Sequence, residues 1–161
     1  MGGQINQSRH GWQLIIFSLI AVFTSTLFTG AAIYINLVEH PARMECGAEL
    51  AATVFGPSYR RAAVMQVALA LAATVAGTST WFLSQRIVWL AGTILIFAVV
   101  PFTLLVIMPT NKQLLDPNLD RTSEATHRLL QRWGRLHCIR SLLSLLASVV
   151  FLLAVSSSLK R

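Results

Sequence analysis

The sequence predicts an all-α fold: a membrane-embedded four-helix bundle with an amphipathic helix that extends the fourth span. Of the 161 residues, 55% are hydrophobic and only 12% are charged, about half the charged fraction of a typical soluble domain. The charges gather in a few intervals and leave four long apolar runs between them. The mean hydropathy of +0.63 fits this distribution. We therefore expect one integral, multi-pass membrane domain over residues 1–161, in a membrane that the sequence does not identify.

The four apolar runs are long enough to cross a hydrocarbon core of roughly 30 Å. The expected spans are residues 12–37, 62–83, 87–108 and 141–159. Only Ser84-Gln85-Arg86 joins the second span to the third, so these two helices must be antiparallel neighbours. Pro101 lies inside the third span, where a proline kink is tolerated in lipid. Such a kink can open a cavity or serve as a plain structural bend.

Two polar intervals lie on the opposite side of the predicted bundle from this link. In the first, residues 42–54 are expected to form a short helix along the membrane, followed by a turn at Gly56-Pro57. In the second, residues 109–120 are expected to form a loop, and residues 123–140 an amphipathic basic helix that runs into the fourth span. With the span included, that helix would be about 55 Å long. Its excess over the bilayer must project into water or bend at Gly134.

The net charge of +7 is explained by attraction to anionic lipid headgroups. No stacking motif accompanies the arginines, so we expect no nucleic-acid partner. The expected partner is the lipid bilayer, and small residues in the first two spans permit a homo-oligomer or contact with another membrane protein. Cys46 and Cys138 lie on the same predicted side, and a bridge between them would require an oxidising compartment.

Two copies of a His-x-x-Arg motif are the first candidates for a functional site. One is His40 with Arg43, and the other is His137 with Arg140. Residues three apart share a helix face, so each motif can present an imidazole beside a guanidinium. The four-span topology places both motifs at the same membrane face, and we expect them to form one site there. The alternative is that the arginines contact lipid phosphate and the histidines lie among the headgroups.

Trp133 and Asn111 are the expected substrate-binding residues near these motifs. Trp133 lies four residues before His137 on the same face and can act as an aromatic wall or as an interfacial anchor. Asn111 follows the third span and can cap a helix or donate to a substrate oxygen. A metal held by His40 and His137 with Asn111 or water is a further alternative. Adjacent helix positions point about 100° apart, and no HxxxH or CxxC is present, so we expect no metal ligands.

The chain resembles a family of small four-helix membrane proteins, the anthrone oxygenase-like family, over residues 20–153. The segments that carry the resemblance are NLVEHPAR at 36–43, MPTN at 108–111, and LQRWGRLHCIR at 130–140. The resemblance implies a cofactor-independent oxygenase that uses O₂ to convert an anthrone into an anthraquinone. We expect the substrate to be an anthrone, a quinol or another flat phenolic molecule. Relatives share a fold more often than they share a substrate.

If this activity applies here, the protein needs a base, a cation for the phenolate oxygen and a slot for the rings. The residues expected to supply them are His40, Arg43, Asn111, Trp133, His137 and Arg140. Either histidine can take the proton, because imidazole titrates near neutral pH. Either arginine can stabilise the oxygen anion, the indole can stack on the rings, and the amide can donate to an oxygen. No cofactor is expected.

Two non-oxygenase functions compete with this one. The chain can be a non-enzymatic subunit or scaffold that binds anionic lipid or a partner protein through Arg128, Arg132 and Arg135 of the basic helix. It can also be a metal or redox protein that uses His40 and His137. A channel is not expected, because no span carries a polar stripe wide enough to line a pore.

Overall fold

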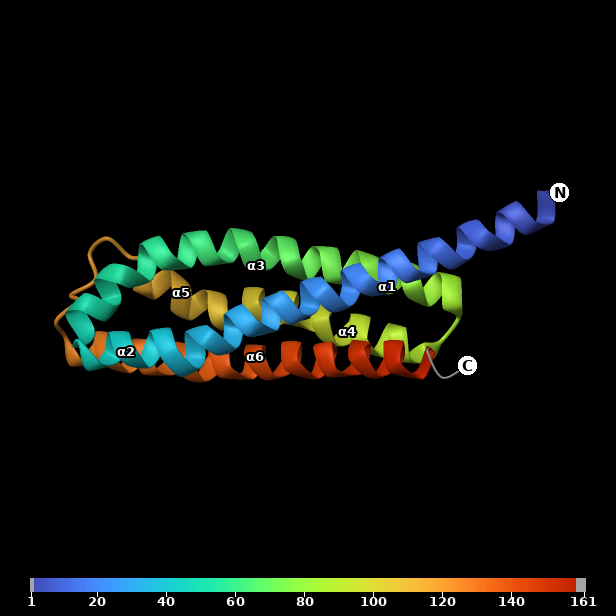
Figure 1. The fold of residues 1–161 in the computed structure, drawn as a ribbon. Helices are drawn as coiled ribbons and strands as arrows, with labels where there is room; N and C mark the ends of the chain where they lie inside the picture. The colour runs from blue at the N-terminus through green and yellow to red at the C-terminus, as the bar shows by residue number, and fades with distance from the viewer. Residues whose placement is uncertain (1, 159–161) are drawn as a thin grey trace.

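The computed structural model describes residues 2–158, with side chains described from residue 10 to residue 157. Helices account for nearly all of this part of the chain, and it contains no strand (Figure 1). In chain order the elements are α1 (Gly2–Tyr34), the π-helix η1 (Ile35–Glu39), α2 (His40–Glu45), α3 (Ala48–Ser84), α4 (Ile87–Phe102), the π-helix η2 (Thr103–Ile107), α5 (Met108–Leu114) and α6 (Glu124–Ser158).

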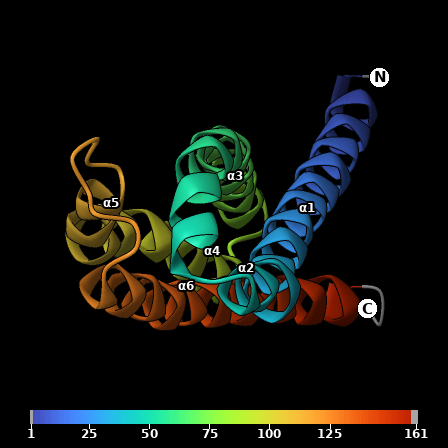
Figure 2. The same cartoon turned by 90° about the vertical axis from the view of Figure 1, so that its left-hand side faces the viewer.

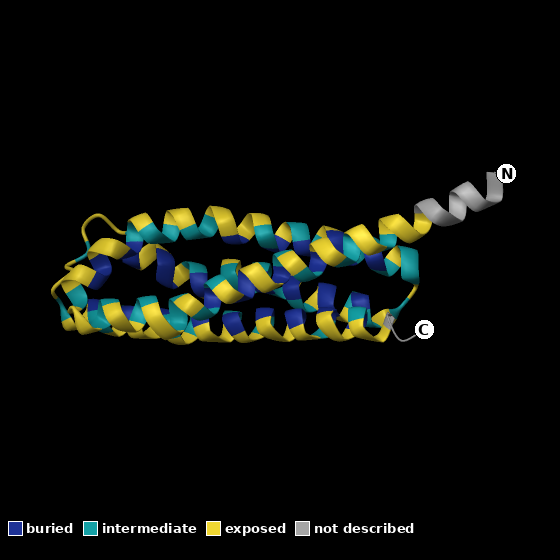
Figure 3. Cartoon of the chain, in the orientation of Figure 1, coloured by how far each residue is buried: buried dark blue, intermediate teal, exposed yellow. Residues whose placement is uncertain are grey.

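Four helical stretches in the described residues are long and apolar enough to cross a bilayer: His10–Glu45, Ala48–Ser84, Ile87–Leu114 and Glu124–Ser157. They form a bundle in which α1 and α4 each pack against both α3 and α6 (Figures 1 and 2). Buried positions face the bundle interior, while the outward faces are exposed and largely apolar (Figure 3). The predicted all-α four-helix bundle is therefore confirmed.

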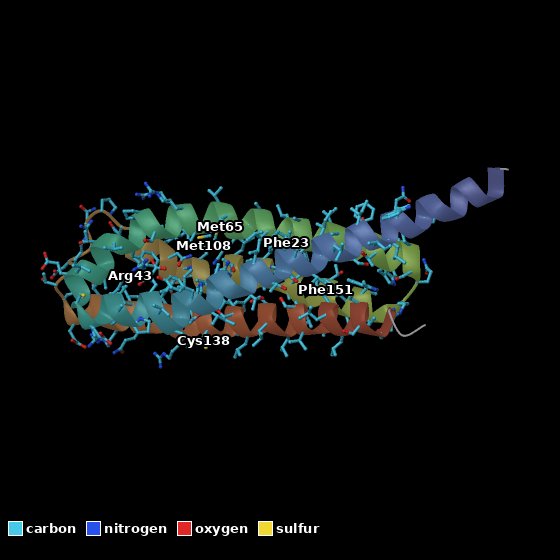
Figure 4. All side chains as sticks on the ribbon, viewed as in Figure 1. Phe23, Arg43, Met65, Met108, Cys138 and Phe151 are labelled. Carbon is cyan, nitrogen blue, oxygen red and sulfur yellow. The ribbon has the colours of Figure 1, made fainter. Side chains whose placement is uncertain are left out.

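Small residues bring the helices close together in the half of the bundle nearer the termini. Phe151 of α6 is fully buried and its ring lies against Trp89 of α4, with ring centroids 5.5 Å apart (Figure 4). A Cβ atom added at Gly92 would come within 2.6 Å of the Phe151 ring, and one added at Gly77 within 2.9 Å. The absence of side chains at these two glycines leaves room for the Phe151 ring, which packs α3, α4 and α6 against one another.

The first polar interval folds differently from the prediction. The chain turns at Gly47, whose φ of +93° favours glycine, and α3 begins at Ala48. The predictions of a membrane-surface helix over residues 42–54 and of a turn at Gly56-Pro57 were wrong, because α3 runs without interruption through Pro57. Its first turns bury Phe55 and neighbouring alanines against α6, and this packing offsets the backbone hydrogen bond that proline cannot make.

The second polar interval is also more helical than predicted. Residues 109–114 belong to α5 rather than to a loop, and only residues 115–123 connect it to α6. Pro109 lies at the junction of η2 and α5, inside the continuous helical stretch Ile87–Leu114, so the helix runs through it as α3 runs through Pro57. Buried Thr110, Asn111 and Leu114 hold the short helix against the bundle.

The amphipathic extension of the fourth span is present as predicted. α6 is one helix from Glu124 to Ser158 and does not break at Gly134, and its first turns run beside α2 and α5 within the bundle (Figure 1). Ser123 caps its start, since the Ser123 hydroxyl accepts the backbone N–H of Thr126 at 3.2 Å.

Candidate functional site

The candidate site lies where the irregular segments of the bundle meet. η1 interrupts the first span just before α2, and η2 follows Pro101 in the third span. π-Helices are rare and often occur at functional sites, because the extra residue redirects side chains into the protein. Both face the polar half of α6, which carries the second His-x-x-Arg motif.

Trp133 is the centre of this region and brings most of the predicted residues together. Its indole stacks on the His137 ring, with centroids 4.8 Å apart, and meets the edge of the His40 ring at 5.2 Å. Phe55 packs edge-on against its remaining side at 5.3 Å. The indole N–H donates to Asn111 Oδ1 at 2.9 Å. Asn111 thus orients the tryptophan through its side-chain oxygen. Asn111 was expected to donate a hydrogen bond to a substrate, but it does not line the cavity described below.

Asn36 fixes the orientation of His137. Its Oδ1 accepts from His137 Nδ1 at 2.7 Å and from the Ser141 hydroxyl at 2.6 Å, and its Nδ2 donates to the Gly134 carbonyl at 3.2 Å. Because the amide oxygen can only accept, Nδ1 of His137 carries the hydrogen and Nε2 carries the lone pair. Sequence reasoning did not assign Asn36 a role, although it opens the 36–43 segment and lies one helical turn before His40.

Arg140 is held by neutral groups alone among the described residues. Its Nη1 donates to His137 Nε2 at 3.2 Å, and its Nη2 donates to Gln66 Oε1 of α3. The guanidinium carbon lies 4.9 Å from the centre of the Phe28 ring of α1. No carboxylate of the described chain pairs with it. Helices α1, α3 and α6 therefore converge on one positive charge whose counter-charge the described residues do not supply.

Arg43 has a different environment from its counterpart Arg140. It forms an ion pair with Glu39 one turn earlier, so its charge is already balanced. Its side chain is mostly buried and lines the same cavity as Arg140. The two motifs thus contribute one paired and one unpaired guanidinium.

A cavity of about 420 Å³ opens beside His137 and Arg140. Its volume is in the range of small-molecule sites, roughly 300–1,000 Å³. Aromatic walls come from Phe55, Tyr59 and Trp133. The polar and charged lining consists of Glu39, Arg43, Ser58, Arg61, Gln66, Thr103, His137 and Arg140, with Glu39 engaged by Arg43. Met65 and Met108 also line it and lie in the same half of the molecule as Arg43 (Figure 4).

His40 lines a second, more open hollow of about 480 Å³ instead of this cavity. Its ring lies over Gly134, where an added Cβ would come within 2.5 Å of Nε2. Cys138 lines the same hollow and is exposed on the outer side of α6 (Figure 4). The structure therefore brings both histidines to Trp133 but places them on different openings.

The described part of the chain contains no set of side chains arranged to bind a metal ion. No group of three or more His, Cys, Asp or Glu side chains lies close enough together to hold an ion. Asn111 Oδ1, the ligand suggested with the two histidines, is engaged by the Trp133 indole. Cys46 and Cys138 are both free and exposed, so they form no bridge.

Comparison with known protein families identifies a match. The family described as anthrone oxygenase matches residues 51–150, a range that includes Gln66, Asn111, Trp133, His137 and Arg140. No curated protein and no solved structure matches the chain. The matched range covers well over half of the sequence. This chain therefore belongs to the anthrone oxygenase family.

Proposed function

We propose that the protein is a membrane oxygenase that needs no cofactor and acts on a flat phenolic or enolic substrate in the cavity beside His137. The observation that carries the proposal is the composition of that cavity. Three aromatic rings, those of Phe55, Tyr59 and Trp133, supply walls suited to a planar molecule, and the His137–Arg140 pair supplies a lone pair beside a positive charge.

The bilayer is the proposed source of the substrate. Met65, Val67 and Leu104 line the cavity, yet they are 48%, 52% and 56% exposed on the apolar outer face of α3 and η2. An opening bordered by such side chains faces hydrocarbon when the helices span a membrane. A sparingly soluble aromatic molecule dissolved in the bilayer would reach the cavity sideways, without crossing water.

The proposed reaction balances with O₂ alone. Loss of a C–H proton from the carbon between the rings of an anthrone gives an anion whose charge is shared with the oxygen. O₂ takes up the electron pair in single-electron steps, bonds to that carbon, and becomes a hydroperoxide on protonation. The O–O bond then breaks as the second C–H proton leaves, which forms the new carbonyl and one water. The ring carbon is oxidised, O₂ is reduced, and no electron from a cofactor is needed.

His137 is the proposed base, and Arg140 the proposed partner of the oxygen anion. The Asn36 hydrogen bond leaves the lone pair of His137 on Nε2, the nitrogen that Arg140 contacts. A substrate oxygen that draws the guanidinium toward itself would release that lone pair for the C–H proton. Arg43 also lines the cavity, but its charge is balanced there by Glu39, so Arg140 is the proposed cation. His40 would act indirectly, by supporting Trp133 from the second hollow.

Oxygen uptake with a simple anthrone tests the proposal. Purified protein in lipid nanodiscs should consume one O₂ per anthrone and form the quinone faster than protein-free nanodiscs do. His137→Ala should lower this rate by about 10²- to 10⁴-fold, the usual range for loss of a general base. His40→Ala should cost less, because His40 does not line the cavity. His127→Ala is the matched control, since His127 lies on the same helix and lines neither opening.

Two results would reject the proposal. Uptake by the wild-type protein no faster than by protein-free nanodiscs would favour a non-enzymatic subunit that uses the basic face of α6. Full activity in both His137→Ala and His40→Ala would remove the histidines as bases and with them the proposed mechanism.

A further inference from the structure

Two buried N–H donors beside the cavity have no partner in the described structure. They are Nε2 of Gln66 and Nε of Arg140. Both residues line the cavity, and Gln66 is only 1% exposed. A third such atom, the Thr110 hydroxyl oxygen, belongs to a residue outside the cavity wall. A buried donor without a hydrogen-bond partner is unfavourable. Two such donors beside one cavity therefore point to an acceptor that a ligand supplies.

The two side chains already act as one unit. Gln66 Oε1 accepts from Arg140 Nη2, which fixes the glutamine amide with its NH₂ group turned away from that bond. The other contacts of Arg140 are the His137 nitrogen and the Phe28 ring, both neutral. A buried guanidinium that has no carboxylate partner strongly favours binding a negatively charged oxygen.

We propose that Gln66 and Arg140 form the subsite that binds an ionised oxygen, a phenolate or enolate, at the buried end of the ligand. This inference rests on the proposed function for the position of the ligand and adds a residue, Gln66, that decides which ligands bind. The rest of the ligand lies along the aromatic walls of Phe55, Tyr59 and Trp133. A molecule without such an oxygen fits the cavity but leaves both donors unpaired, so the subsite selects against it.

A dye that reports its own ionisation tests the subsite. The probe is 2-hydroxyanthraquinone, a planar phenol whose absorbance changes when its hydroxyl loses the proton. The dye is added to wild-type protein in nanodiscs at the pH of its half-ionisation in protein-free nanodiscs. Binding at two N–H donors should raise the ionised fraction, because these donors favour the charged oxygen.

The decisive variant is Gln66→Glu. Glutamate has nearly the same shape and still accepts from Arg140, so the bundle keeps its packing, but it replaces the donor by a negative charge. Gln66→Glu should no longer bind the ionised form of the dye. Gln66→Leu should bind that form roughly tenfold to a hundredfold more weakly than the wild type does. Gln131→Leu makes the same change at the second hollow and should bind like the wild type. If Gln66→Leu fails to fold, Gln66→Glu decides alone.

Wild-type affinity and an unchanged dye spectrum in Gln66→Glu would overturn the subsite. Oleate tests whether the same kind of oxygen comes from a lipid instead. Displacement of the dye by an equal concentration of oleate, with the same dependence on Gln66, would assign the subsite to a lipid carboxylate and overturn the aromatic ligand. The dye is already a quinone, so Gln66-dependent binding without O₂ uptake from an anthrone would keep the subsite and reject the oxygenase.

Discussion

Replacing Asn36 by leucine should both destabilise the bundle and release the ring of His137. Leucine is similar in size but removes the three hydrogen bonds that Asn36 makes with His137, Ser141 and Gly134. Hydrogen bonds between membrane helices average about 0.6 kcal/mol each, which gives about 2 kcal/mol for three. The stranded N–H of His137 adds a penalty of its own, so the total loss should lie between about 2 and about 4 kcal/mol.

Reversible unfolding in mixed detergent micelles measures this loss, and ¹⁵N NMR of the imidazole measures the proton position. In the wild type the hydrogen should lie on Nδ1 of His137, hydrogen-bonded to Asn36. In Asn36→Leu the Nδ1 signal should move because that bond is lost, while Nε2 still accepts from Arg140. Ser141→Ala removes a single bond to Asn36 and should cost less than about 1 kcal/mol. Asn118→Leu, in the exposed loop before α6, is the control and should leave both signals unchanged.

A free energy of unfolding of Asn36→Leu within about 0.5 kcal/mol of the wild-type value, the ordinary range for surface changes, would contradict this prediction. Unchanged nitrogen signals of His137 in Asn36→Leu would contradict it as well. In either case the amide would not be what holds the imidazole.

Three further changes test other parts of the account. Gly134→Ala places a Cβ within 2.5 Å of the His40 ring, so the His40 ring should move away from Trp133. The free energy of unfolding should fall by about 1 kcal/mol or more, although alanine has the better helix propensity. Unchanged His40 NMR shifts and an unchanged free energy of unfolding would contradict this. Ser123→Ala removes the cap of α6 and should cost about 1 kcal/mol in the same unfolding assay, whereas a gain in stability would contradict the cap. Hydrogen bonds from the Thr122 hydroxyl and N–H to the Asp120 carboxylate lower the pKa of Asp120 below its ordinary value of 3.8, so their contribution is present above that pH and is lost as the pH falls through the lower folded value. The Thr122 amide shift should therefore titrate with a midpoint below 3.8, and a midpoint at or above it would contradict the assignment.

The bundle was predictable because its signals are long and periodic. Apolar runs of span length and a three-residue link leave few arrangements open, and the basic helix before the fourth span follows from its apolar stripe. The two prolines misled the prediction for physical reasons. Pro57 and Pro109 read locally as breaks. Packing keeps α3 continuous through Pro57, and the helical stretch Ile87–Leu114 likewise continues through Pro109 at the junction of η2 and α5.

The site was predictable only in part. The four-span topology placed His40 and His137 at the same end of the bundle, and both contact Trp133. Spacing does not tell which opening a side chain lines, and His40 and Asn111 lie outside the cavity that His137 lines. Gln66 is one of several polar residues in an alanine-rich helix, and what sets it apart is its contact with Arg140, 74 residues away. Only the tertiary structure supplies that contact.

The most direct test of the central claim is an experimental structure of the protein in nanodiscs with a bound anthraquinone. The expected result is planar density inside the cavity lined by Phe55, Tyr59 and Trp133, with one oxygen turned toward Arg140. Density beside His40 in the second hollow would contradict it, as would a cavity that stays without ligand at saturating quinone.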